Sequence, residues 1–88
     1  MEDIEIFRKK LLFKASHRGT KEMDILIGNF ASKYITLFDL NELHLLNGIL
    51  DTDDDEVYKM ILHKIKIPEV LDNRVTKLLI DYSNSIDE

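Results

Sequence analysis

The sequence predicts an all-α fold, a compact bundle of about five short helices that forms one domain over residues 1–88. Apolar residues recur at spacings of three and four along most of the chain, which is the pattern of helices with one buried face. No segment shows a convincing alternation of apolar and polar residues, as a half-buried strand would. With 88 residues, 44% of them apolar and 33% charged, the chain fits a single small globular domain.

The first predicted helix covers residues 3–16. Its apolar residues share one face: Ile4, Phe7, Leu11 and Leu12. Its basic residues are expected largely on the opposite side: Arg8, Lys9, Lys10 and Lys14. The helix ends in a basic turn that complements the negative end of the helix dipole, and Gly19 is a natural left-handed cap after it.

The second predicted helix runs from about Thr20 to Tyr34, with an apolar stripe made of Met23, Leu26, Ile27, Phe30, Ala31 and Tyr34. Gly28 lies inside this helix, where glycine costs about 1 kcal/mol relative to alanine, so we expect close helix packing there. Asp39 followed by Glu42 resembles a capping box, which predicts that a third helix starts at Leu40 and continues through Leu50.

An acidic run at residues 51–56 can cap and favour the start of a fourth helix, which carries Val57, Tyr58, Ile61, Leu62 and Ile65. Pro68 ends that helix. A fifth helix is expected from about Glu69 to Ser83, followed by a short polar tail, and its apolar residues are Leu71, Val75, Leu78, Leu79 and Tyr82.

Charge and composition exclude several classes of partner. The formal net charge of −5 argues against a protein that gathers phosphate backbones, so no nucleic acid partner is expected. No apolar run approaches the roughly 18 to 20 residues that span a membrane, so we expect no membrane insertion. The lack of cysteine agrees with a reducing compartment. The acidic amino terminus is unlike a leader peptide and favours the bacterial cytoplasm over the mitochondrial matrix, although a mature chain without its leader would look the same.

No motif for catalysis, cofactor binding or metal binding stands out. The acidic run places Asp51, Asp53 and Asp55 at positions one, three and five of a calcium loop. Position six is Glu56 rather than glycine, however, and position twelve is Leu62 rather than glutamate. The histidines are widely spaced, so a structural zinc site is not expected either. The patterns GxxxxGK and GxGxxG are absent and no catalytic triad is indicated, which disfavours an autonomous enzyme.

A polar, charge-dense corner at residues 16–24 lies between the first two predicted helices, and we interpret it as a docking surface. Arg18 offers a planar fork suited to carboxylates and carbonyls, and Gly19 lets another backbone approach closely. Glu22 would lie one helical turn beyond Arg18 on the same face. A plain helix end, followed by acids that favour the next helix, explains the same residues, and both interpretations stay open on these grounds.

Residues 18–31 read RGTKEMDILIGNFA and resemble the RGxxE signature and following helix of the succinate dehydrogenase assembly factor 2 family. Members of this family are the small flavinylation factors of bacteria and mitochondria. The similarity extends from residues 8–12 through residues 43–50 and the Asp-rich turn to Pro68. Family members often carry a tryptophan in the fourth helix and a glycine near its end, where this chain has Met60 and His63.

The resemblance implies a five-helix bundle that binds the flavoprotein subunit of succinate dehydrogenase and promotes covalent attachment of FAD to a histidine of that subunit. Its contact surface would contain the three signature positions and three neighbours, namely Arg18, Gly19 and Glu22, with His17, Met23 and Asp24. Such a helper would hold no FAD of its own and would not be an enzyme. We expect a monomer, with fumarate reductase as a further candidate partner. Two alternatives stay open: a flavin transferase with its own FAD site, and a generic helical adaptor.

Overall fold

The computed structural model describes residues 3–86, and within them it contains five α-helices, two short 3-10 helices and no strand. The all-α prediction is therefore confirmed for this part of the chain. The elements are α1 (Ile4–Ala15), α2 (Lys21–Tyr34), η1 (Ile35–Leu37), α3 (Leu40–Leu50), α4 (Asp54–Ile61), η2 (Glu69–Leu71) and α5 (Arg74–Ile86).

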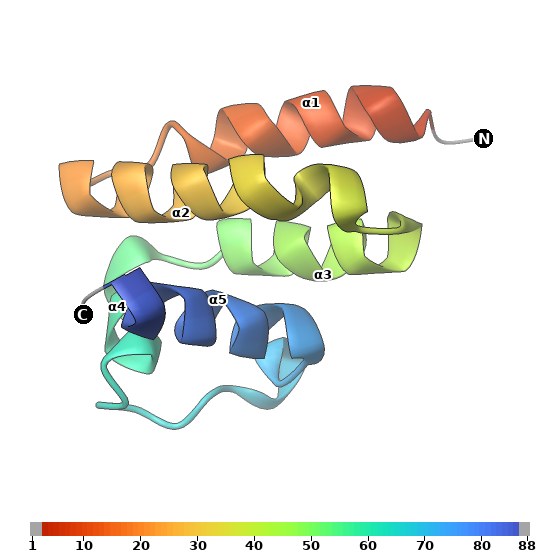
Figure 1. The fold of residues 1–88 in the computed structure, drawn as a ribbon. Helices are drawn as coiled ribbons and strands as arrows, with labels where there is room; N and C mark the ends of the chain where they lie inside the picture. The colour runs from red at the N-terminus through yellow and green to blue at the C-terminus, as the bar shows by residue number, and fades with distance from the viewer. Residues whose placement is uncertain (1–2, 87–88) are drawn as a thin grey trace.

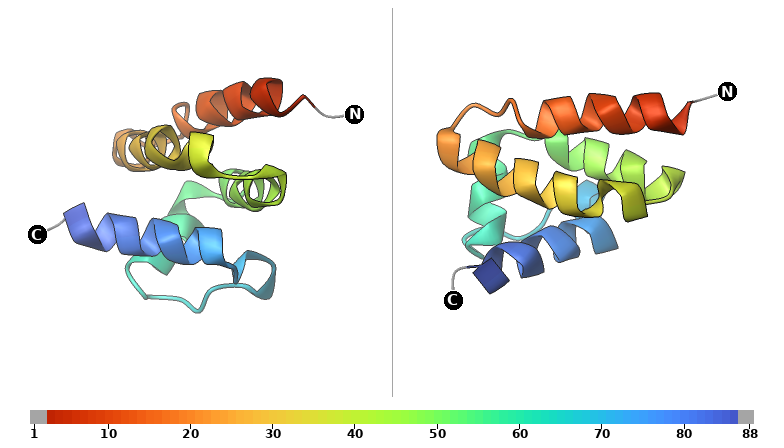
Figure 2. Two further views of the ribbon diagram at one scale, coloured as in Figure 1. Left: turned by 45° about the vertical axis from the view of Figure 1, so that its right-hand side comes forward. Right: turned by 45° about the horizontal axis from the view of Figure 1, so that its top comes forward.

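The helices form a layered bundle in which α1 runs antiparallel to α2 and packs against both α2 and α3 (Figure 1). Helix α5 lies on the other side of the bundle, where it packs against α2, α3 and α4. The connection at residues 62–73, which contains η2, loops around the side of α5 that faces away from α1 (Figure 2). None of the described helices is both long and apolar enough to cross a membrane.

The core is apolar and has Phe30 at an aromatic centre. The Phe30 side chain is fully buried, and its ring centroid lies 5.1 Å from that of Tyr34, 5.6 Å from that of Tyr82 and 6.3 Å from that of Phe38. Each of the five described α-helices contributes further side chains that are almost completely buried, among them Leu11, Ile27, Leu43, Leu46, Ile49, Val57 and Leu79. Each such leucine or isoleucine contributes roughly 1.5 to 3 kcal/mol of hydrophobic stabilisation.

Local capping explains why α2 and α3 begin where the sequence predicts. The Oδ1 of Asp39 accepts a hydrogen bond from the backbone N–H of Glu42 at 2.8 Å, and Glu42 Oε1 accepts from the N–H of Asp39 at 3.0 Å. The predicted capping box is thus confirmed. Thr20 caps α2 in the same way, through the N–H of Met23. Asn47-Gly48, a dipeptide common in hairpin turns, lies inside α3 instead.

The end of α1 differs from the prediction. The helix stops at Ala15, and the hydroxyl of Ser16 donates to the carbonyl oxygen of Leu12 at 2.6 Å. Gly19 lies further along the connection and does not have a positive φ, so its assignment as a left-handed cap was wrong. The close packing expected at Gly28 is present, because a Cβ added there would lie 3.7 Å from the carbonyl oxygen of Ala15.

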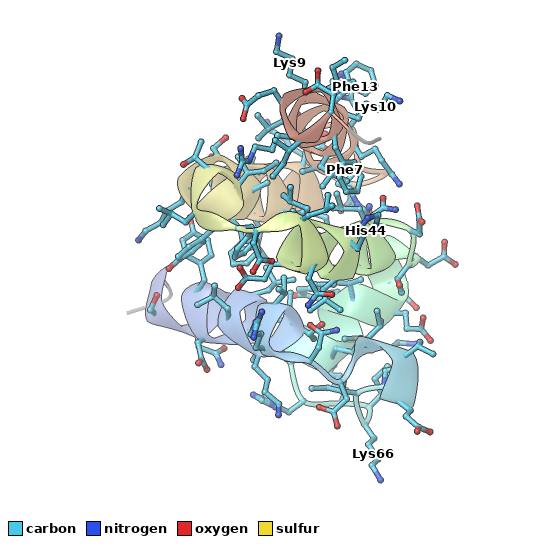
Figure 3. All side chains as sticks on the ribbon, turned by 90° about the vertical axis from the view of Figure 1, so that its right-hand side faces the viewer. Phe7, Lys9, Lys10, Phe13, His44 and Lys66 are labelled. Atoms are coloured by element: carbon cyan, nitrogen blue, oxygen red, sulfur yellow. The ribbon has the colours of Figure 1, made fainter. Side chains whose placement is uncertain are left out.

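The sequence pattern placed the basic side chains of α1 largely on the side opposite its apolar face. In the structure, one of them turns toward the bundle. Arg8 is partly buried, and its Nε donates to the carbonyl oxygen of Ile35 at 3.1 Å. Its Nη2 donates to the carbonyl oxygen of Phe38 at 2.9 Å. Arg8 therefore satisfies two carbonyls in the connection between α2 and α3, while the side chains that point away from the bundle in Figure 3 are Lys9 and Lys10.

Helix α4 is shorter than predicted, because it ends at Ile61 rather than continuing through Ile65. The N–H of Lys64 donates to the carbonyl oxygen of Lys59 at 2.9 Å, and the N–H of His63 donates to that of Met60 at 3.1 Å. This pair of bonds is a Schellman motif, and it places His63 in the left-handed region with φ 59°. The backbone at His63 is thus one that favours glycine, the residue that the family resemblance implies near this helix end.

The fifth helix also starts later than predicted. Glu69 begins the short element η2, and α5 begins at Arg74. The reason is a cap four residues further along, where Oδ1 of Asn73 accepts from the N–H groups of Val75 and Thr76, both at 3.0 Å. Because this cap satisfies the free N–H groups of the first turn, the helix starts after it, and it then continues to Ile86.

The substitution His63→Gly is expected to raise the free energy of unfolding by about 1 kcal/mol, because glycine adopts a positive φ without the steric cost that other residues carry. Chemical denaturation followed by circular dichroism measures the change. Lys64→Gly, at the next position, is the matched control and is expected to lower stability slightly, since its φ is not positive. Equal losses of stability in the two variants would contradict this account of the helix end.

Candidate functional site

The candidate site lies where two connections meet at one end of the bundle. Residues 16–20 join α1 to α2, and residues 51–53 join α3 to α4. Both connections lie at the same end of the molecule (Figures 1 and 2). They are held together by Arg18 in the first connection and Asp54 at the start of α4, whose side chains form an ion pair at 2.6 Å.

The guanidinium of Arg18 is directed into the molecule. Its side chain is only 7% exposed, and its Nε donates to Oδ1 of Asp54. Its Nη1 donates to the carbonyl oxygen of Leu50 at 2.5 Å, and Nη2 donates to that of Thr52 at 2.7 Å. All three guanidinium nitrogens are therefore bonded within the chain, and the arginine satisfies carbonyls that the end of α3 leaves without helical partners.

Two carboxylates fix the backbone of the same connection. Oδ2 of Asp54 accepts from the N–H of Gly19 at 2.8 Å and from the N–H of Thr20 at 3.3 Å. The carboxylate of Asp24 accepts from the N–H of Arg18. Because backbone and side chains are both held, the surface at the corner has a defined shape before anything binds to it.

Gly19 is exposed, and the fold itself does not require a glycine at this position. A Cβ added there would come no closer than 3.4 Å to any atom, and that atom is Oδ2 of Asp54. This distance is ordinary van der Waals contact, and the φ of Gly19 is not positive. A need for glycine at this position would therefore come from a molecule that approaches the corner from outside.

Glu22 faces outward in the first turn of α2, and within residues 3–86 its carboxylate has no hydrogen-bond or ion-pair partner. The expectation that Arg18 and Glu22 share a helical face was wrong, because Arg18 precedes the helix, which begins at Lys21. The two charged residues of the signature point in different directions. Arg18 donates hydrogen bonds within the chain, whereas Glu22 is exposed and can contact a partner.

The three neighbouring residues differ in their exposure. His17 is exposed, and its ring stacks on that of Phe13 with a centroid distance of 3.9 Å. Its Nδ1 lies 2.7 Å from the carbonyl oxygen of Phe13. Met23 is a core residue that is only 3% exposed, and Asp24 is partly buried beneath Arg18. Of these three, His17 offers the most surface to a partner.

Two hollows adjoin the corner. A pocket of about 320 Å³ is lined by residues of α2 and α4, namely Thr20, Glu22, Met23, Asp54, Asp55 and Tyr58. A more open hollow of about 500 Å³ lies on the side of the acidic run, and Arg18 and Gly19 line it together with Asp51, Asp53 and Asp55. The sequence did not single out Asp54 or Tyr58 as site residues, because Asp54 lies 36 residues from its arginine and no spacing rule links them.

The acidic run does not gather into a metal site. Asp51 binds Nζ of Lys14 at 2.5 Å, and Asp55 binds Nζ of Lys59 at 3.1 Å. Lys14 also donates to Oδ1 of Asn47 in α3, and its side chain remains 37% exposed. Within residues 3–86, no group of three or more histidine, aspartate or glutamate side chains is placed to hold a metal ion.

One known protein family matches most of this chain. The family model described as the flavinator of succinate dehydrogenase matches residues 9–83. The chain belongs to this family. The match includes the corner, the acidic run and the core of all five helices, so it covers the fold as well as the signature.

Individual relatives of this flavinator family are similar over much of the chain. A protein of Dictyostelium discoideum named "Succinate dehydrogenase assembly factor 2, mitochondrial" is 35% identical over 79 residues, which make up 90% of this chain and 56% of the relative. A protein of Acetobacter pasteurianus named "FAD assembly factor SdhE" is 37% identical over 62 residues, or 70% of this chain and 57% of the relative. The chain thus spans little more than half the length of these relatives.

In this member of the flavinator family, Arg18→Ala is expected to lower the free energy of unfolding by about 3 kcal/mol, because it leaves a buried carboxylate and two carbonyls without their donor. Arg74→Ala is the matched control. Arg74 is 64% exposed and pairs with Glu42 at 3.3 Å, so its loss should cost at most about 1 kcal/mol. Urea denaturation of both variants tests this, and equal small losses would contradict a structural role for Arg18.

Proposed function

We propose that this protein binds the flavoprotein subunit of succinate dehydrogenase through the corner at residues 16–24 and promotes covalent attachment of FAD to a histidine of that subunit. The family match over residues 9–83 is the observation that carries the proposal. The names of two relatives, an assembly factor of succinate dehydrogenase and an FAD assembly factor, support the same client and the same chemistry.

The protein acts by binding rather than by catalysis. Attachment of FAD requires the flavin, the attacking imidazole and nearby charge-stabilising groups of the flavoprotein to be held together. A helper that binds this arrangement more tightly than others increases its population without touching the flavin. The corner suits such a role because its backbone is already fixed by Asp54 and Asp24, so little conformational freedom is lost on docking.

FAD is held by the flavoprotein and not by this chain. The open hollow beside Gly19 is lined by several aspartates, whose negative charge opposes a diphosphate. The guanidinium that lines it, that of Arg18, already donates to Asp54, Leu50 and Thr52. Titration of FAD against the purified protein separates this proposal from a flavin transferase with its own site, which would bind the cofactor.

The proposal further includes a monomeric protein that acts in the bacterial cytoplasm and serves fumarate reductase as a second client. One relative is bacterial, from Acetobacter pasteurianus, and others are named as mitochondrial. Size-exclusion chromatography with light scattering measures the oligomeric state. Flavin attachment to the fumarate reductase flavoprotein, assayed with and without this protein, tests the second client.

The decisive experiment is in-gel flavin fluorescence of the denatured succinate dehydrogenase flavoprotein from cells with and without this protein. Covalently bound flavin survives denaturation, so the fluorescence measures attachment directly. We expect the signal to fall strongly in the deletion strain. An unchanged signal, in cells without a second helper, would refute the proposal and leave a generic helical adaptor.

Gly19→Arg and Gly19→Ala separate docking from folding. The free energy of unfolding of both variants is expected to lie within about 1 kcal/mol of that of the original protein, since the added Cβ meets only Asp54 at 3.4 Å. Only the arginine variant should lose flavin attachment, by about tenfold or more, because its long side chain covers the contact surface. Circular dichroism and in-gel fluorescence measure the two effects. Loss of the folded state in Gly19→Arg would remove the docking explanation.

A further inference from the structure

A third hollow lies next to the pocket of about 320 Å³ that adjoins the corner. It has a volume of about 370 Å³ and lies between α2, the end of α4 and α5. Glu22 and Tyr58 line both hollows, so the two hollows are neighbours, with Asp54 lining the first and Asn84 lining the second. We refer to these two hollows together as the side groove.

The far end of the side groove exposes apolar side chains from two elements. Ile25 of α2 is 54% exposed, and Leu62, directly after α4, is 42% exposed. The core residue Ile61 lines the hollow next to them. Large apolar side chains on opposite sides of a hollow form a place where a partner side chain can be buried on several sides.

The near end of the groove is negative and aromatic. The carboxylate of Glu22 lies where the two hollows meet, and within residues 3–86 no group neutralises it. Tyr58 is 48% exposed beside it, and an aromatic face next to a carboxylate favours a cation. Among the described residues that line either hollow, none is a lysine or an arginine. The charge of the groove therefore complements a basic side chain.

We infer that the side groove receives a segment of the flavoprotein subunit in which an arginine or lysine lies next to an apolar residue. The cation binds between Glu22 and Tyr58, and the apolar side chain packs between Ile25 and Leu62. This inference rests on the proposed function, because the groove begins at the corner through which that partner docks. It extends the contact surface from the signature to α4 and α5.

The apolar part is tested with Ile25→Ser and Leu62→Ser, measured by calorimetric titration of purified flavoprotein subunit into each variant. Each substitution is expected to weaken binding about tenfold. Leu37→Ser and Val70→Ser are matched controls, because these side chains are 73% and 85% exposed and line neither hollow of the groove. All four variants should keep nearly the original unfolding midpoint.

The charged part is tested with Glu22→Gln, for which the dissociation constant is measured from low salt up to about 0.3 M NaCl. An ion pair with a basic group makes binding weaken with salt, so the glutamine variant should bind about tenfold more weakly at low salt and depend less on salt. An unchanged salt dependence would overturn the assignment of a basic side chain to this position.

The outcomes distinguish the inference from the function on which it rests. If the unaltered protein does not bind the flavoprotein, both are overturned. If it binds, and Gly19→Arg weakens binding while Ile25→Ser and Leu62→Ser behave as the two controls do, only the side groove is overturned. Self-association of the protein that Ile25→Ser abolishes would assign the groove to a second copy and would likewise overturn the inference.

Discussion

The ion pair between Arg18 and Asp54, whose side chains are only 7% and 14% exposed, is the interaction on which the shape of the corner at residues 16–24 depends. Removing these two charges from water is costly, and an isolated pair would gain little. Here the arginine also donates to the carbonyl oxygens of Leu50 and Thr52, and the carboxylate accepts from two backbone N–H groups. These bonds offset the cost of burial and join the connection after α1 to the connection after α3.

The signature residues differ in their structural roles. Arg18 is inside and determines the shape of the corner, whereas Gly19 and Glu22 are outside and can meet a partner. Loss of activity on replacing the arginine would therefore report on folding as much as on docking. The glycine and the glutamate give cleaner information, because a Cβ added at Gly19 meets no atom closer than 3.4 Å and Glu22 has no ion-pair partner among residues 3–86.

The sequence was sufficient for the first half of the fold, where local signals agree with one another. The apolar period and the Asp39 capping box both predict helices that the structure contains. The sequence-based prediction of the fourth helix was wrong after Ile61. Apolar residues continue the helical pattern there, but His63 adopts a left-handed conformation that ends the helix. The connection at residues 16–20 lies between the first two helices, as predicted, and its role as a docking surface stays a prediction. The inward direction of the Arg18 side chain depends on a carboxylate far along the chain, which periodicity and spacing do not reveal.

Three basic side chains of α1 and the turn after it bind groups within the bundle. They are therefore not available to balance the negative charge on the neighbouring surface around Glu22. Arg8 binds carbonyls before α3, and Lys14 binds side chains at the end of α3. Arg18 binds the carbonyl of Leu50, the last residue of α3, and that of Thr52 beyond it. Three cations thus hold α3 from both ends. Among residues 3–86, no basic side chain forms an ion pair with the carboxylate of Glu22, which lies beside an exposed tyrosine in a chain whose net charge is −5. If the proposed partner docks at this end, the contacts that stabilise the bundle also favour a partner with positive charge.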